Sequence, residues 1–171
     1  MNIRPIIITG FMGSGKTSVT RALARMLNCR AIDLDQWIAE SERRTPKAII
    51  ERDGEPAFRE IETRSLREAL AEDVEQVIAL GGGAWTLPGN RDLIAQHKGF
   101  SVWLDAPFEL CWQRIAASGN QWPLARDKEQ AQTLHMQRRV LYKLAALHVL
   151  AEKGQGVDEL ASTIAKALWK R

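Results

Sequence analysis

Short apolar runs alternate with amphipathic stretches along the chain, and this alternation predicts repeated β–α units. The apolar runs have the length and the β-branched content of buried strands. They lie at Ile6–Thr9, Ala31–Leu34, Val77–Leu80, Phe100–Leu104 and Leu147–Leu150. Repeated β–α units require a parallel sheet with helices on both faces. The pattern therefore predicts an α/β fold of three layers, α/β/α, around a central parallel sheet.

The segments between these runs supply the predicted helices and loops. Helices are predicted at Lys16–Leu27, Gln36–Arg44, Glu55–Ala71, Arg91–Lys98, Pro107–Ala117, Ala131–Ala145 and Val157–Trp169. We expect a short turn at Lys47–Arg52 and a loop at Trp85–Gly89. The polar segment 118–130 interrupts the helical pattern and is expected to be a mobile lid over a ligand. A chain of 171 residues is long enough for one domain, which we place over residues 1–171.

Composition narrows the classes of function. Hydrophobic residues make up 45% and charged residues 26%, as in soluble globular proteins. The net charge of +3 is too small to imply a nucleic-acid partner. The sequence has neither a signal peptide nor a run of about 18 apolar residues, so we expect a cytoplasmic protein with no membrane partner. Cys29 and Cys111 lack the spacing of metal ligands and are expected to be reduced thiols.

The first predicted strand leads into Gly10-x-x-x-x-Gly15-Lys16-Thr17, the complete P-loop pattern between a strand and a helix. Its glycines let backbone N–H groups surround phosphate oxygens, and the start of the helix favours anions. Lys16 brings a positive charge to the outer phosphates, and the Thr17 hydroxyl is suited to Mg²⁺. A chance match in a glycine-rich turn is the alternative, which the flanking strand and helix disfavour. The pattern predicts ATP and Mg²⁺, with the nucleotide held by Gly13, Ser14, Gly15, Lys16, Thr17 and Ser18.

Two carboxylates, Asp33 and Asp35, end the second predicted strand, where open α/β sheets bind ligands. In an extended segment, residues two apart point to the same side. One carboxylate is then expected to hold Mg²⁺ through water, and the other to bind a substrate hydroxyl. The alternatives are a pair of solvated acids or an N-cap for the next helix. The neighbouring P-loop favours the functional interpretation.

The triplet Gly81–Gly83 follows the third predicted strand. Three consecutive glycines cost backbone entropy, so they are expected where a ligand must touch the main chain. A flexible turn is the alternative. Arg59 lies near a predicted helix start, and taken alone it fits a solvated arginine paired with Glu55 or Glu62.

The whole set of motifs resembles the shikimate kinase family, which has a P-loop fold like that of nucleoside-monophosphate kinases. The resemblance covers nearly the whole chain. Its motifs are GFMGSGKT, Asp33-Leu-Asp35, Gly54-Glu55-x-x-Phe58-Arg59-x-x-Glu62, Gly81–Gly83 and Arg138-x-x-Leu141-Tyr142. In this order and spacing the set is specific, and it fits shikimate kinase better than the gluconate-kinase-like protein that a P-loop alone would allow.

The resemblance implies ATP-dependent phosphorylation of shikimate at its ring 3-hydroxyl, by a monomer. Asp33 is similar to the family's aspartate that holds Mg²⁺ beside Thr17, and Asp35 to its hydroxyl ligand and base. Lys16 then stabilises the transferred phosphoryl group. The other positions that match the family are Arg59 and Arg138 at the substrate carboxylate, Gly82 and Gly83 as backbone contacts, and Arg114 over the adenine.

The lid departs from the family pattern at one position. The family usually has an arginine directly before Pro-Leu-Leu, whereas this chain reads Gln121-Trp122-Pro123-Leu124-Ala125. A cation at the developing charge of phosphoryl transfer is worth about 10³–10⁵ in rate. Arg126 is expected to supply that charge from the same loop. Val140, where the family usually has proline, is a smaller departure.

Three functions therefore stay open. The first is shikimate kinase. The second is a related kinase for another small hydroxylated acid, suggested by Trp122. The third is a nucleotide-binding module with little catalysis, against which both Asp33 and Asp35 argue, because binding ATP needs no substrate base.

Overall fold

A parallel sheet of five strands forms the centre of the part of the chain that the structure describes, in the order β2-β3-β1-β4-β5. The computed structural model describes residues 4–72, 74–119, 123–124 and 126–169. The strands are β1 (Ile6–Thr9), β2 (Arg30–Asp33), β3 (Gln76–Ala79), β4 (Phe100–Asp105) and β5 (Leu147–Leu150). β1 is central, since Ile7 pairs with Ile78 of β3 on one side and with Ser101 of β4 on the other.

Helices fill the connections between the strands. In chain order they are α1 (Lys16–Leu27), α2 (Leu34–Glu42), α3 (Pro46–Asp53), α4 (Glu55–Ala71), the 3₁₀ helix η1 (Ala84–Thr86), α5 (Pro88–Gln96), α6 (Phe108–Ala117), α7 (Lys128–Tyr142) and α8 (Val157–Trp169). Among the described residues, every helix is too short or too polar to traverse a lipid bilayer.

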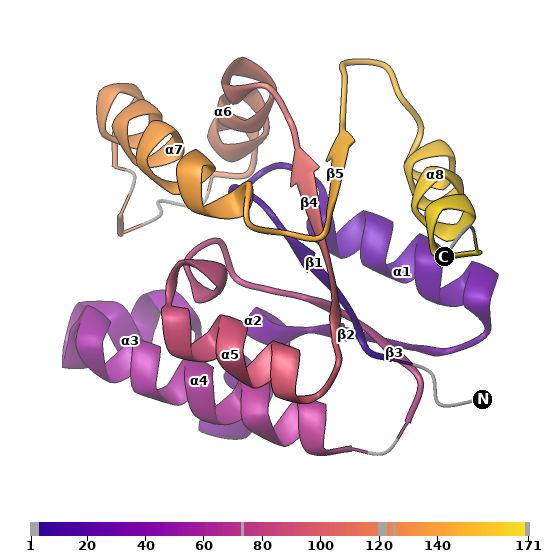
Figure 1. Cartoon of the computed structure of the whole chain (residues 1–171). Coiled ribbons are helices and arrows are strands. Elements are labelled where there is room, and N and C mark those ends of the chain that lie inside the picture. The colour runs from indigo at the N-terminus through magenta and orange to yellow at the C-terminus, as the bar shows by residue number, and fades with distance from the viewer. Residues whose placement is uncertain (1–3, 73, 120–122, 125, 170–171) are drawn as a thin grey trace.

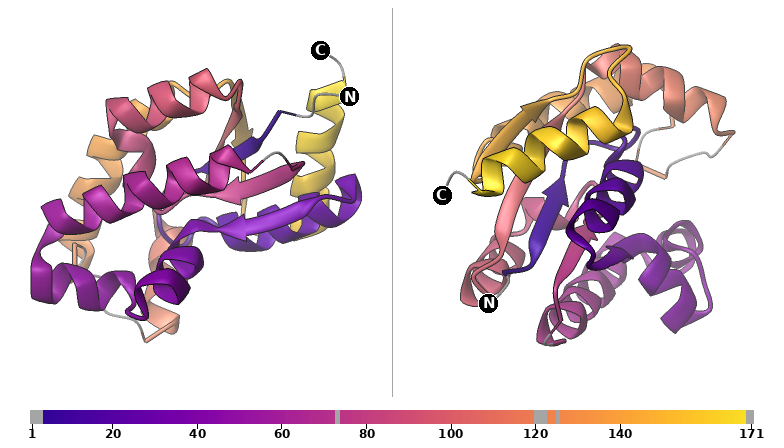
Figure 2. Two further views of the ribbon diagram at one scale, coloured as in Figure 1. Left: turned by 90° about the horizontal axis from the view of Figure 1, so that it is seen from below. Right: turned by 90° about the vertical axis from the view of Figure 1, so that its right-hand side faces the viewer.

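The helices form layers on both faces of the sheet (Figure 1). α1 and α8 pack together on one face, whereas α4 and α5 cover the other with α2 and α3 beside α4. The two further views in Figure 2 show the same separation of α1 and α8 from α3 and α4. α6 and α7 lie over the carboxyl ends of the strands (Figure 1). This arrangement confirms the predicted three-layer α/β/α class.

Two prolines begin helices where the sequence analysis expected irregular structure. The turn expected at Lys47–Arg52 is wrong, because α3 spans it. The Thr45 hydroxyl caps α3 by accepting from the Ala48 N–H at 3.2 Å, and Pro46 occupies the first turn, where its missing N–H costs nothing. The loop expected at Trp85–Gly89 is also wrong, since η1 and the first turn of α5 occupy it.

Asp33 and Asp35 do not share an extended segment, which corrects the geometric reason given for pairing them. β2 ends at Asp33, and Asp35 lies in the first turn of α2. The Asp33 carboxylate caps this helix by accepting from the N–H groups of Asp35 at 3.1 Å and Gln36 at 3.2 Å. The N-cap alternative is thus correct for Asp33.

The lid segment is shorter than the expected 118–130. α7 begins at Lys128 rather than at Ala131, because Asp127 caps it by accepting from the Gln130 N–H at 2.8 Å. Trp122, the departure from the family pattern, lies outside the described residues.

The capping of α3 generates a prediction about stability. Thr45→Ala removes the side-chain acceptor of this helix and should lower the free energy of unfolding by about 1 kcal/mol. Thr45→Ser keeps the acceptor and should stay close to wild type. Urea unfolding followed by circular dichroism measures both. Equal stability of the alanine and serine variants would contradict the assignment of this cap.

Candidate active site

The loop after β1 has the form of an anion cradle. Gly15 caps α1 with φ +99°, a left-handed conformation that suits glycine, so the first N–H groups of α1 have no side-chain cap. The Lys16 ammonium donates to the Phe11 carbonyl at 2.8 Å across the loop. The buried Ser14 hydroxyl has no hydrogen-bond partner among the described atoms. Free donors that converge on one loop favour a phosphate ligand.

A cavity of about 430 Å³ opens beside this loop. Its wall includes each residue predicted to hold the nucleotide, namely Gly13, Ser14, Gly15, Lys16, Thr17, Ser18 and Arg114. Arg114 reaches the loop from α6 and donates to the Gly13 carbonyl at 3.0 Å. The opposite wall comes from the segment after β5, including Glu152 and Gln155. The sequence analysis missed this wall, although its place after the last predicted strand was a usable signal.

Thr17 and Asp33 lie together at the edge of this cavity. The Thr17 hydroxyl donates to Asp33 Oδ2 at 2.5 Å. Within the described ranges, no group of three or more His, Cys, Asp or Glu side chains could hold a metal by itself. One hydroxyl and one carboxylate suit Mg²⁺, which usually keeps several waters and binds substrate phosphates in such sites. The donor set therefore fits Mg²⁺ delivered with a nucleotide.

Asp35 lies where the nucleotide cavity meets a second pocket, because it lines both. Burial raises the pKa of Asp35 to about 6, and the nearby Asp33 charge adds to the shift. Lys16 and Arg59 oppose it. The ammonium of Lys16 is itself enclosed by the loop, although part of the side chain stays exposed, and burial lowers its pKa to about 8. A carboxyl with a raised pKa beside a phosphate site is suited to act as a base.

We call the second pocket the acceptor pocket. Its charged residues are Asp35, Lys47, Arg59, Glu62 and Arg138, and Pro123 and Leu124 of the lid segment also line it. The sequence analysis missed Lys47 because it treated that segment as a turn, and no local signal places a helix face against a pocket. Two predicted substrate ligands, Arg59 and Arg138, do meet here, although α4 and α7 are far apart in the sequence.

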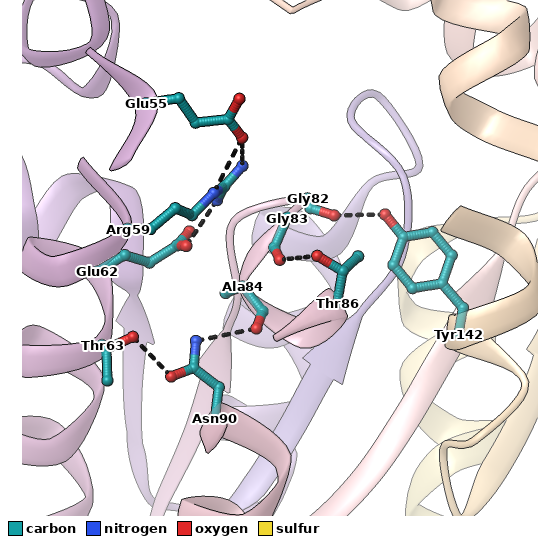
Figure 3. A network of polar contacts seen from close by, with 10 residues as sticks. All are labelled: Glu55, Arg59, Glu62, Thr63, Gly82, Gly83, Ala84, Thr86, Asn90 and Tyr142. Carbon is teal, nitrogen blue, oxygen red and sulfur yellow. Dashed lines mark hydrogen bonds and ion pairs between the residues drawn. The ribbon is translucent and has the colours of Figure 1, made fainter. Parts of the chain in front are cut away.

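The two arginines differ in their surroundings. Arg59 lies between two carboxylates, with Nη2 2.9 Å from Glu55 Oε1 and Nη1 2.6 Å from Glu62 Oε2 (Figure 3). Glu62 is fully buried, and burial raises its pKa to about 7 against the opposing effect of Arg59. Arg138 is also buried, but none of the ion pairs between described residues includes it. Burial lowers the pKa of Arg138, so its charge would gain from an anionic ligand.

Glycines 81–83 lie flush against these charged groups. A Cβ on Gly81 would lie 2.8 Å from both Asp35 Oδ1 and Glu62 Oε1. A Cβ on Gly82 would lie 3.2 Å from Arg138 Nη1, and one on Gly83 would collide with the Arg59 guanidinium. The triplet therefore lets these charged side chains approach the main chain closely, and the expected contact with a ligand stays a prediction.

The glycine loop is held in place by hydrogen bonds, so the flexible-turn alternative is wrong. Figure 3 shows the Tyr142 hydroxyl reaching the Gly82 carbonyl, at 2.5 Å, and the Thr86 hydroxyl reaching the Gly83 carbonyl, at 2.6 Å. Asn90 donates to the Ala84 carbonyl at 2.9 Å. Carbonyls that are already paired leave the loop a fixed wall of the acceptor pocket.

Arg126 lies apart from the groups gathered at this pocket. It is exposed, and it lines a groove with Pro123, Leu134 and other residues of the lid segment and α7. Within the described residues it is not among those that line the acceptor pocket. Arg126 is also not among the described residues that line the nucleotide cavity.

Known proteins are similar to this chain over most of its length. Residues 12–169 match the family model described as shikimate kinase. The chain is 38% identical to a shikimate kinase of Cereibacter sphaeroides, over 98% of this chain and 84% of that protein. It is 34% identical to a shikimate kinase of Ruegeria pomeroyi, over 98% and 86%.

Solved structures agree with these relatives. A shikimate kinase from Acinetobacter baumannii in complex with shikimate is 34% identical, with a TM-score of 0.89, and the match covers 98% of this chain and 94% of that one. A deoxyadenosine kinase from M. mycoides is 13% identical with a TM-score of 0.60, over 98% and 100% of the two chains, and shares the fold alone. The P-loop, the paired aspartates, the two arginines and the matched length lead to one conclusion: this chain belongs to the shikimate kinase family.

Proposed function

We propose that this protein transfers the terminal phosphoryl group of ATP to the ring 3-hydroxyl of shikimate. The observation that carries the proposal is the place of Asp35, at the junction between a P-loop cavity and a pocket with two arginines. A phosphotransferase for a hydroxylated acid needs a base between its donor site and a carboxylate site. We further propose that it acts as a monomer in the cytoplasm, and that residues 1–171 form a single domain whose lid lies between α6 and α7.

On the donor side, the loop amides from Gly13 to Ser18 and the Lys16 ammonium bind the phosphates of ATP, and Arg114 covers the adenine ring. Thr17 and Asp33 are the residues that would hold Mg²⁺. When bound, Mg²⁺ neutralises charge on the transferred phosphoryl group. Most of the rate in this chemistry comes from positioning and charge neutralisation.

On the acceptor side, Arg59 and Arg138 bind the shikimate carboxylate, and the backbone of Gly82 and Gly83 contacts the ring. A planar guanidinium matches a carboxylate with two parallel hydrogen bonds. Asp35 orients the 3-hydroxyl and accepts its proton as the hydroxyl oxygen forms a bond to the terminal phosphorus. The bond from that phosphorus to the bridging oxygen breaks, and ADP leaves with the electron pair.

A second candidate is a kinase of the same family for another small hydroxylated acid. The observation that favours it is Trp122, at the position where the family usually has a lid arginine. A panel of hydroxylated acids distinguishes the two candidates, since a wide preference for shikimate would exclude the second one.

The primary test is release of ADP from Mg-ATP with and without shikimate. We expect release that depends strongly on shikimate, together with formation of shikimate 3-phosphate. ADP release that shikimate does not increase would overturn the proposal, and the panel of acids would then identify the acceptor.

Arg126 is proposed to supply the lid charge that Trp122 cannot. Arg126→Ala should lower kcat by about 10³-fold, the lower end of what such a cation contributes. Lys128→Ala is the matched control, because Lys128 is the next cation along and is paired with Glu109 at 2.9 Å. Steady-state kinetics measure both, and equal kcat values for the two variants would remove Arg126 from the mechanism.

The pKa values of the site predict a bell-shaped pH profile. Below about 6, Asp35 is protonated and cannot accept the hydroxyl proton, so kcat/KM for shikimate should fall. Above about 8, Lys16 loses the charge that attracts phosphates, so kcat/KM for ATP should fall.

One variant distinguishes Asp35 from a second carboxyl whose pKa lies in the same pH range. Glu62, whose pKa is about 7, lies in the same pocket. Glu62→Gln should leave the acid limb near 6 if Asp35 is the base. Loss of that limb in Glu62→Gln would reassign it to Glu62.

The close approach at the glycine loop predicts a graded effect of alanine. Gly83→Ala should raise KM for shikimate by about tenfold or more, because its methyl group would displace the Arg59 guanidinium. Gly82→Ala should have a smaller effect, since Arg138 Nη1 would be 3.2 Å away. Gly89→Ala is the control, because its methyl group would meet nothing within 4 Å. Equal KM values for all three variants would show that the close approach is unimportant.

A further inference from the structure

A buried carboxylate outside the acceptor pocket carries a further inference, which rests on the proposed function. Asp105 ends β4 and is only 5% exposed. A buried charge is costly unless it is paired and hydrogen-bonded. No role described above uses Asp105.

Asp105 is paired with one residue from α7 and one from β5. Its Oδ2 lies 2.9 Å from Arg139 Nη2 and 2.9 Å from His148 Nε2. Trp103 supports both partners: its ring stacks on His148 with centroids 4.2 Å apart, and the Arg139 guanidinium lies 5.5 Å from its centroid. We call these four residues the Asp105 cluster.

The cluster holds the turn of α7 that carries the substrate arginine. Arg138 precedes Arg139 directly, and it is the buried arginine for which no ion pair is found between described residues. Leu141 and Tyr142 attach the same turn to the opposite side, since the Leu141 carbonyl accepts from Trp85 Nε1 at 2.9 Å. The Tyr142 hydroxyl donates to the Gly82 carbonyl at 2.5 Å.

The end of α7 is therefore fixed between two supports. One support is the glycine loop with Trp85, and the other is the Asp105 cluster on β4 and β5. A helix is stiff over one turn, so a shift or rotation at Arg139 moves Arg138 as well. Placement errors of about 1 Å at a substrate-binding group can cost 10²-fold in rate.

We propose that Asp105 is a positioning residue that acts through Arg139 to orient Arg138 toward the carboxylate of the acceptor. It touches neither substrate. Its loss should weaken recognition of the acceptor carboxylate and leave nucleotide binding intact, because the loop amides and Lys16 are held by other contacts.

Asp105→Asn and Arg139→Met test the proposal, and Arg139→Lys is the conservative variant that keeps a charge for Asp105. The first two should raise KM for shikimate by about tenfold and leave KM for ATP unchanged. Tenfold is the effect expected when a displaced Arg138 loses one charge-assisted hydrogen bond to the acceptor carboxylate. Arg139→Lys should recover most of the loss. Arg25→Met is the matched control, because Arg25 of α1 forms an exposed ion pair with Asp158 of α8.

A second acceptor separates positioning from general damage. The analogue of shikimate with a hydroxymethyl group in place of the carboxylate offers nothing for Arg138 to pair with. The wild type should use it poorly, and Arg139→Met should lower its kcat/KM no further. An equal loss for shikimate and for the analogue would mean that the cluster is merely structural, and the proposal would fail.

The two proposals fail in different ways. Failure of the proposed function appears as wild-type protein that does not turn over shikimate. Failure of the positioning role appears as active wild type whose variants either keep its KM for shikimate or lose activity equally with both acceptors. Arg139 is half exposed, so Arg139→Met should fold even if Asp105→Asn does not.

Discussion

Four charged side chains converge on the loop Gly81–Gly83, because its glycines have no side chains to keep them away. Asp35 and Glu62 both lie against Gly81, Arg138 lies against Gly82, and Arg59 lies against Gly83. These groups come from α2, α4 and α7, which are distant in the sequence. Charges buried this closely are tolerable only because two carboxylates and two arginines meet at the same loop. The same packing sets the chemistry, since burial moves the pKa of Asp35 into the range in which a carboxylate becomes an effective base.

The site also depends on α7, which contacts it at three places. Its first turn comes directly after the lid segment and is capped by Asp127. Its last turns carry Arg138, and Arg139 forms an ion pair with Asp105 of β4. His135, between these ends, packs edge-on against Phe11 of the P-loop with ring centroids 5.0 Å apart. α7 therefore contacts the donor loop through His135, follows the lid segment in the chain and carries Arg138 of the acceptor pocket.

Local patterns sufficed for the sheet, the P-loop and most helices, because each depends on residues close together in the sequence. They failed at Pro46 and Pro88, since a proline is compatible with both the end and the beginning of a helix, and the cap from Thr45 decides between them. The pairing of Asp33 with Asp35 rested on a mistaken geometric reason, since β2 ends at Asp33 and Asp35 lies in the first turn of α2. The places of Lys47 in a pocket wall and of Asp105 in a buried ion pair could not be predicted from local patterns. Both arise only when elements distant in the sequence pack together.

A cation on the lid could attract the acidic acceptor, or it could stabilise the charge that develops during phosphoryl transfer. The charges of the acceptor pocket distinguish these two roles. Arg59 is already neutralised by Glu55 and Glu62, whereas Arg138 pairs with no described carboxylate. Between described residues, the one ion pair found for Lys47 is with Glu51, at 3.9 Å. The acceptor pocket therefore takes most of its uncompensated positive charge from Arg138 and Lys47, and the described lid residues that line it, Pro123 and Leu124, are uncharged. A chain with tryptophan at the usual lid arginine can then keep its affinity for the acceptor, and the cost of that replacement falls on the charge that develops during phosphoryl transfer.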